Sequence, residues 1–185
     1  VHTMEVTDKT TPVYALLERV SDWFHGETVD DGSAVCRRHH LEHTGKNTYT
    51  IAIDLAMYEH TGDEEYFNRA VVRARRTASR LWQEKVGHWT YWPGMHDGRN
   101  MSNSAIDSGA CTDTLATLLA RYEDKLEEQD KAQFRGAVNK NASTYLVPAA
   151  KDKPIINQRL WAATGLATAA ALQNNAEWKQ VVCES

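Results

Sequence analysis

Apolar residues recur along most of this 185-residue chain at intervals of three and four, which is the period of an α-helix with one buried face. Residues 11–25 show the pattern clearly, with Pro12 in a first-turn position. The apolar side chains of that segment share one face: Val13, Leu16, Leu17, Val20 and Phe24. The same period predicts further helices over residues 33–43, 46–60, 64–84, 103–123, 127–146 and 155–172. The pattern therefore predicts an all-α protein.

One four-residue sequence occurs twice and has the composition of a helix end. Glu42-His43-Thr44-Gly45 is matched by Glu59-His60-Thr61-Gly62. A glycine just past a helix end adopts the left-handed backbone conformation without steric cost. Asp63 suits the cap of the helix that follows, and the stretch from Leu172 to Trp178 resembles a third copy with asparagine in place of glycine. We expect tight turns between antiparallel helices at all three places.

A longer spacing indicates repeated hairpins. Helices rich in small residues begin near Lys46, Ser104 and Ile155, about 58 and 51 residues apart (104 − 46 and 155 − 104). Each is followed by a more amphipathic helix, so we expect an inner, buried helix and an outer, half-exposed helix in each hairpin. On the first outer helix four arginines are predicted to line an exposed face: Arg69, Arg73, Arg76 and Arg80. The whole chain, 1–185, is expected to form one helical-hairpin domain.

Composition narrows the class of protein. An apolar fraction of 42% with 25% charged residues is typical of a globular protein. No run approaches the roughly 20 apolar residues of a membrane helix, and the N-terminus shows no signal-peptide core, so no membrane association is expected and the compartment stays open. A net charge of −4 argues against a nucleic-acid partner. Cys36, Cys111 and Cys183 have no paired spacing, and reduced, mostly buried thiols are expected.

Two stretches resemble a known group of proteins. Residues 58–67 (YEHTGDEEYF) are similar to the hairpin turn of α/α-toroid carbohydrate-active enzymes, the six-hairpin glycosidases and toroid polysaccharide lyases. Residues 157–167 (NQRLWAATGLA) resemble an inner helix of the same group, and the likeness spans roughly residues 46–180. The resemblance implies a carbohydrate-active enzyme. A full toroid has about six hairpins and this chain has room for three or four, which predicts a partial toroid, truncated at its C-terminus, or a shorter open array.

The connections that lead into the inner helices are the long ones, namely residues 26–32, 85–102 and 147–154. In a hairpin array these loops gather on one face, where binding concentrates. The N-termini of the inner helices point to the same face, and their free N–H groups favour anions. An acidic sugar such as a uronate would suit that face.

Residues 87–100 concentrate aromatic, acidic and basic side chains: Trp89, Tyr91, Trp92, His96, Asp97, Arg99 and Asn100. Aromatic rings stack on sugar faces, and the polar groups supply acid–base and carboxylate-binding chemistry. The alternative is an ordered loop whose aromatic rings pack on the core, with Asp97-Gly98 as a turn. Two further groups could join this loop, namely Asp107 near the start of one inner helix, and Asn157 with Arg159 at the start of another. N-capping is the simpler interpretation of Asn157.

The leading functional hypothesis is carbohydrate processing on this face, with a saccharide partner and no cofactor. In a lyase, Tyr91 or His96 would remove the proton beside a carboxylate neutralised by Arg99, Asn100 or Arg159. In a hydrolase, Asp97 and Asp107 would be the carboxylate pair. In either enzyme, Trp89, Trp92 and Asn157 would help to bind the substrate. The alternative is a non-catalytic helical-repeat module that binds a protein or a glycan.

One stretch formally matches a metal motif. Residues 39–43 (HHLEH) fit the H-x-x-E-H pattern of inverted zinc peptidases. Glu42-His43, however, belongs to the repeated turn element, and Glu59-His60 recurs without a second histidine. We therefore expect no metal site there.

Overall fold

The computed structural model describes residues 11–26, 32–33, 35–36, 41–93 and 98–185. Helices make up most of these residues, and the predicted all-α class is confirmed. The helices are α1 (Thr11–Gly26), α2 (Thr44–Thr61), α3 (Glu64–Ser79), α4 (Gly98–Tyr122), α5 (Glu128–Asn141), α6 (Val147–Asp152), α7 (Ile156–Gln173) and α8 (Ala176–Glu184), with a 3₁₀ turn η1 (Glu123–Lys125) and a π-helical stretch η2 (Ala142–Leu146). Within the described residues no helix is long and apolar enough to cross a membrane.

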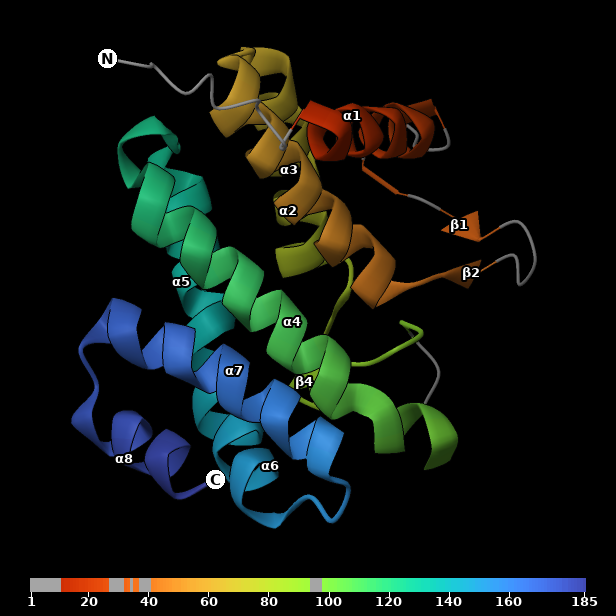
Figure 1. Ribbon diagram of the computed structural model, residues 1–185. Helices are drawn as coiled ribbons and strands as arrows, with labels where there is room; N and C mark the ends of the chain where they lie inside the picture. Colours follow the sequence, from red (N-terminus) through yellow and green to blue (C-terminus); the bar gives the residue numbers. More distant parts are fainter. Residues whose placement is uncertain (1–10, 27–31, 34, 37–40, 94–97) are drawn as a thin grey trace, which may run out of the picture.

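The helices pack as successive hairpins, with α2, α4 and α7 as the inner members. Figure 1 shows α4 in the middle, with α2 on one side and α7 on the other. The amphipathic partners α3, α5 and α8 each pack against the inner helix that precedes them. The N-terminal ends of α2, α4 and α7 all lie toward the right-hand side of Figure 1. This is the side on which the sequence predicted that function would lie.

Helix α4 forms the centre of the core and meets α7 at backbone distance. A β carbon on Gly165 would lie 2.5 Å from the carbonyl oxygen of Gly109, and one on Gly109 would lie 2.1 Å from the carbonyl oxygen of Trp161. Only residues without a side chain permit such an approach. The close crossing explains why α4 and α7 carry glycine at these two positions.

Two of the three predicted turns are confirmed. Gly62 has a left-handed backbone (φ 72°) and donates its N–H to the carbonyl of Tyr58, while Asp63 caps the N–H of Glu65 at 2.9 Å. Asn174 is also left-handed (φ 49°), and Asn175 caps the N–H of Trp178 at 3.0 Å.

The third predicted turn, at Gly45, is wrong, as is the helix predicted over residues 33–43. Strands β1 (Val35–Cys36) and β2 (Leu41–Glu42) pair antiparallel there, and Gly45 lies in the first turn of α2. A second short pair, β3 (Trp82–Gln83) and β4 (His88–Trp89), follows α3, which ends before the predicted residue 84. The expected loop at 147–154 is also mostly helical, because α6 occupies residues 147–152.

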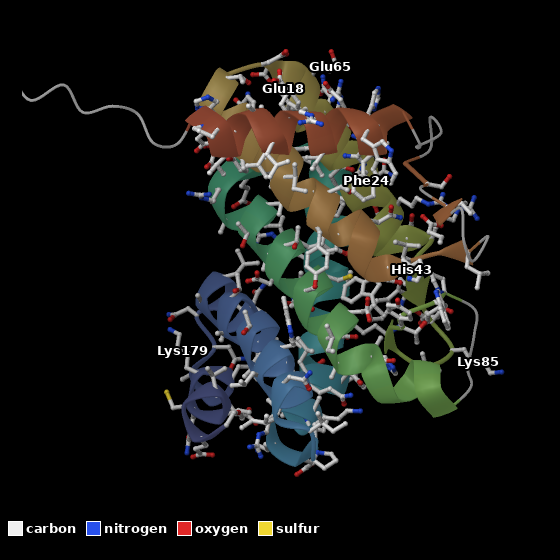
Figure 2. The ribbon with its side chains drawn as sticks, turned by 45° about the vertical axis from the view of Figure 1, so that its right-hand side comes forward. Glu18, Phe24, His43, Glu65, Lys85 and Lys179 are labelled. Carbon is white, nitrogen blue, oxygen red and sulfur yellow. The ribbon has the colours of Figure 1, made fainter. Side chains whose placement is uncertain are left out.

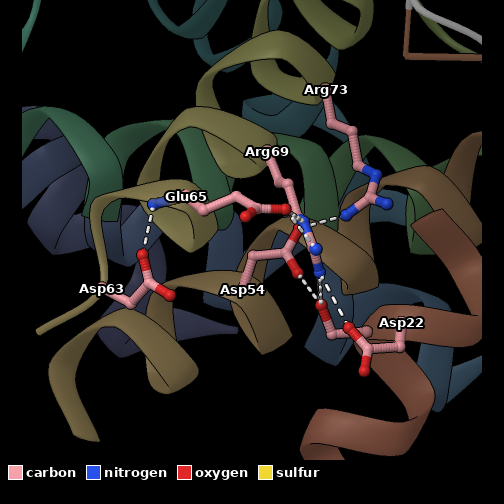
Figure 3. A network of polar contacts seen from close by, with 7 residues as sticks. Asp22, Asp54, Asp63, Glu65, Arg69 and Arg73 are labelled. Atoms are coloured by element: carbon pink, nitrogen blue, oxygen red, sulfur yellow. Dashed lines mark hydrogen bonds and ion pairs between the residues drawn. The ribbon is translucent and has the colours of Figure 1, made fainter. Parts of the chain in front are cut away.

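The predicted exposed arginine face of α3 is wrong for most of its length. Arg73 pairs with Asp54 of α2, and only 2% of its side chain is exposed. Figure 3 shows the network around this pair, in which Arg69 binds Asp22 of α1 at 3.0 Å. Further along, Arg76 makes two 2.6 Å bonds to Glu42 of β2. The periodicity could not show that α1 and β2 supply partners for this face.

Candidate functional site

Asp107 is an acidic side chain enclosed by the packing of α4 against α2. It is 4% exposed, and the backbone N–H of Gly45, in the first turn of α2, donates a hydrogen bond to its carboxylate. Burial raises the pKa of Asp107 to about 7, although this hydrogen bond lowers it. A β carbon on Gly45 would lie 2.8 Å from Oδ1 of Asp107, so the glycine allows the carboxylate to approach the helix end.

Tyr49, one turn further along α2, forms the exposed edge of this site. Tyr49 is 45% exposed, and its ring lies on the same side of α2 as Gly45. A β carbon added to Gly45 would lie 3.7 Å from Cε2 of the Tyr49 ring. Burial, followed by the charge of Asp107, raises the pKa of the Tyr49 hydroxyl. The ring of Trp161, from α7, lies 6.3 Å from that of Tyr49. Three inner helices therefore contribute side chains to one place.

The buried side of the site holds a hydroxyl group and a thiol group. Thr48 and Cys111 are both fully buried, with Oγ1 and Sγ 3.0 Å apart. Burial raises the pKa of Cys111 well above its ordinary value, which keeps the side chain a neutral thiol. The expectation of a reduced, buried thiol holds for Cys111, whereas Cys183 is free and exposed.

The segment after β4 brings two predicted residues to the start of α2. Thr44 donates its backbone N–H to the carbonyl of Tyr91 at 3.2 Å and its hydroxyl to the carbonyl of Thr90 at 2.6 Å. The indole N–H of Trp92 donates to Nε2 of His43 at 3.2 Å. Figure 2 shows His43 at the N-terminal end of α2. Tyr91 and Trp92, both half-buried, thus lie within about one turn of the Gly45 N–H that binds Asp107.

Trp89 lies away from solvent and has a different role. Its ring is fully buried, its indole N–H donates to the carbonyl of Thr77 at 2.8 Å, and it packs edge-on against Trp82. Its own carbonyl accepts a 2.9 Å hydrogen bond from Ser108 of α4. Trp89 therefore anchors the 88–93 segment to the core, and its burial gives no support to the sugar-stacking role expected for it.

The remaining predicted residues are placed only in part. His96 and Asp97 lie outside the described residues, and for Arg99 and Asn100 only the backbone of the first turn of α4 is described. Asn157 is exposed in the first turn of α7, whose cap position is Ile155, so Asn157 does not cap that helix. Arg159 is half-buried, and its Nε has no hydrogen-bond partner in the described part of the chain.

The residues of the H-x-x-E-H match make other contacts. Both carboxylate oxygens of Glu42 bind Arg76, and Asn47 donates a further hydrogen bond to Glu42. His43 contacts Trp92, while His39 and His40 lie outside the described residues. Among the side chains that the structure places, no group of three His, Cys, Asp or Glu residues could hold a metal ion.

The described part of the chain contains hollows at α6 and between α2 and α4. One, of about 280 Å³, is lined by Tyr145, Pro148, Ala149, Asp152 and Lys153 around α6. The other, of about 180 Å³, lies between α2 and α4 and is lined by Ala52, Leu55, Ala56, Glu59, Asp113, Thr114, Thr117 and Arg121. We call the second hollow the α2/α4 groove.

The sequence pattern does not indicate Gly45 and Tyr49 as members of the site. It predicts a helix end at Gly45 and gives Tyr49 no role. The sequence does contain one sign of the site, since Gly45 and Tyr49 are four residues apart and therefore neighbours on one face of a helix.

No protein-family model, curated protein or solved structure matches this chain.

Proposed function

We propose that this protein is a carbohydrate-active enzyme in which Asp107 is the acid–base residue. One observation carries the proposal, namely a carboxyl group on α4 with a pKa of about 7, held against the N-terminal end of α2. A carboxyl that titrates near neutrality can both donate and accept a proton at working pH. Ordinary surface carboxylates cannot donate under those conditions.

The surroundings of Asp107 support a sugar as the ligand. Tyr49 and Trp161 lie on one side of it, and Tyr91 and Trp92 lie beside the first turn of α2. Aromatic faces pack against the C–H faces of sugar rings, while hydroxyl groups and N–H donors orient their oxygens. The alternation of inner α2, α4 and α7 with outer α3, α5 and α8 supports the proposed kinship with toroid enzymes.

Of the two chemistries, the burial and raised pKa of Asp107 favour hydrolysis. A buried carboxylic acid with a raised pKa can protonate the oxygen of a glycosidic bond as the bond breaks. Asp97 remains the proposed second carboxylate. β-Elimination would instead use Tyr91 or His96 as the base, with Arg99, Asn100 or Arg159 on the uronate carboxylate.

The test is a screen of the protein against neutral and acidic polysaccharides, with reducing ends and ultraviolet absorbance measured in parallel. We expect new reducing ends without absorbance, and a loss of about 10²-fold or more in Asp107→Asn. That variant keeps an oxygen for the Gly45 N–H. Asp152→Asn, which removes an exposed carboxylate from α6, is the matched control and should keep full activity.

The other outcomes are equally informative. Ultraviolet absorbance would indicate β-elimination and move the acid–base role to Tyr91 or His96. Saccharide binding without turnover would indicate a binding module and overturn the proposal. Undiminished turnover in a folded Asp107→Asn variant would remove Asp107 from the chemistry.

A further inference from the structure

The α2/α4 groove lies between α2 and α4, on the C-terminal side of Gly45 and Asp107. On α2, Tyr49, Ala52 and Ala56 recur at helical spacing and so share one face. On α4, Asp107, Thr114 and Arg121 are seven residues apart and also share one face. Both faces carry groove residues. The lining begins at Ala52 and Asp113, so the groove lies along the helix faces that carry the Asp107 site, further toward the C-terminal ends of α2 and α4.

The groove has room for about one or two sugar units. The eight residues from Asp113 to Arg121 (121 − 113) span about 12 Å of helix at 1.5 Å per residue. At its far end Arg121 and Glu59 form an ion pair of 2.6 Å. Between these two points the lining side chains from α2 include Ala52 and Ala56, which leave the groove open.

The chemistry of the lining suits a chain rich in hydroxyl groups. The methyl groups of Ala52 and Ala56 face the hydroxyl-bearing Thr114 and Thr117 across the groove. Asp113 accepts a hydrogen bond from Thr168 of α7, which fixes the carboxylate at the wall. Carboxylate and hydroxyl oxygens accept hydrogen bonds from sugar hydroxyls, and methyl groups pack against sugar C–H groups.

The charge of the lining disfavours an acidic chain. Glu59 and Asp113 contribute two negative charges and Arg121 contributes one positive charge, which leaves a net charge of −1. Arg121 is already paired with Glu59. A polyuronate would bring further carboxylates beside Asp113, and like charges placed together reduce affinity. A neutral glycan has no such cost.

We propose that the α2/α4 groove binds the continuation of a neutral glycan chain whose bond to be broken lies at Asp107. This inference rests on the proposed function, and it specifies the substrate class. β-Elimination requires a uronate carboxylate beside the bond. A neutral chain in the groove therefore implies hydrolysis, in which water adds across the glycosidic bond and leaves one new reducing end.

The binding test uses the methyl groups that line the groove. The protein is labelled with ¹³C at alanine and threonine methyl groups and titrated with glucose, with cello-, malto-, xylo- and mannohexaose, and with hexagalacturonate. We expect at least one neutral hexaose to shift the methyl signals of Ala52, Ala56, Thr114 and Thr117, and neither glucose nor hexagalacturonate to do so. Unmoved groove signals with every hexaose, or a larger response to hexagalacturonate, would overturn the proposal.

Variants that fill the groove separate this proposal from the proposed function. Ala52→Trp should lower kcat/KM for the active hexaose by about 10-fold or more and leave the shortest substrate unchanged. Thr117→Tyr fills the groove from the opposite wall and should have the same effect, so it replaces Ala52→Trp if that variant folds poorly. Ala132→Trp, at an exposed position of outer helix α5, is the matched control and should leave kcat/KM unchanged for both substrates.

The two proposals can fail independently. Turnover that requires Asp107 but is unaffected by Ala52→Trp and Thr117→Tyr would overturn the groove and keep the proposed function. Groove signals that respond to a neutral hexaose without any turnover would keep the groove as a binding site and overturn catalysis at Asp107.

Discussion

The backbone N–H of Gly45 donates a hydrogen bond to the carboxylate of Asp107, which joins the first turn of α2 to the middle of α4. The contact has two opposing effects on Asp107. The hydrogen bond favours the charged carboxylate, whereas burial by the surrounding helices favours the neutral acid. Burial has the larger effect, so the pKa of Asp107 rises to about 7.

Asp107→Asn is expected to be more stable relative to the wild type at pH 8 than it is at pH 4. The pKa of Asp107 is raised from 3.8 to about 7 on folding, so the stabilising contribution of the neutral acid is lost as the pH rises through that range. Asparagine does not titrate and avoids this loss. The variant should gain up to about 4 kcal/mol over the wild type between pH 4 and pH 8, measured by urea unfolding at both pH values. An equal stability difference at both would contradict the raised pKa, and Asp152→Asn serves as the control.

Gly45→Ala is expected to destabilise the protein by about 1–3 kcal/mol, because the new methyl group would meet Oδ1 of Asp107 at 2.8 Å. Thermal or urea unfolding measures the loss. In Gly45→Ala/Asp107→Ala the crowding partner is absent, so the double variant should be more stable than the sum of the single effects predicts. Additive effects would show that the two residues are not in contact. Gly136→Ala, an open position in α5, is the control and should gain up to about 1 kcal/mol.

The helices were largely predictable from the sequence because their signals are local. The period of apolar residues placed α1, α2, α4 and α7 within a few residues of their ends, apart from the N-terminal end of α4. The turn at Gly62 and Asp63 was predictable because left-handed glycine and a capping aspartate act within a few residues. Gly45 follows the same three residues, Glu-His-Thr, as Gly62. Its role was not predictable, because it is set by Asp107, 62 residues further along the chain (107 − 45).

The candidate site shows the same division. Asp107, Tyr91 and Trp92 were selected for their chemistry, and the structure gathers them around the start of α2. Arg73 was predicted to lie on the exposed face of an amphipathic helix, yet it is buried beside Asp54 of α2. Residue type and period indicate which side chains are capable of chemistry. Which of them meet depends on helix packing that no local pattern encodes.

Gly165→Ala and Gly109→Ala are expected to destabilise the protein by about 3 kcal/mol or more, since each new methyl group would collide with backbone. The contacts would be 2.5 Å to the carbonyl of Gly109 and 2.1 Å to the carbonyl of Trp161. A flexible side chain could move aside, but a helix backbone cannot do so without separating α4 from α7. Chemical unfolding, with Gly136→Ala again as control, measures the effect. Stability close to that of the wild type would show that the two helices do not cross at these glycines.

Arg73→Met is expected to destabilise the protein by about 3–5 kcal/mol, whereas Asp54→Leu/Arg73→Met should recover most of that loss. Both side chains are almost fully enclosed, at 2% and 0% exposure, and Ser21 of α1 donates to Asp54 at 2.5 Å. Burial raises the pKa of Asp54 and lowers that of Arg73, each against the effect of its partner, so desolvation exceeds their attraction. The single variant leaves Asp54 buried without its cation, and the double variant removes both buried charges. Urea unfolding of the wild type, the single variant and the double variant measures these differences. If the ion pair were a net stabilising one, the double variant would be at least as unstable as the single variant. Lys131→Met, which breaks the surface pair with Glu128, should leave stability unchanged.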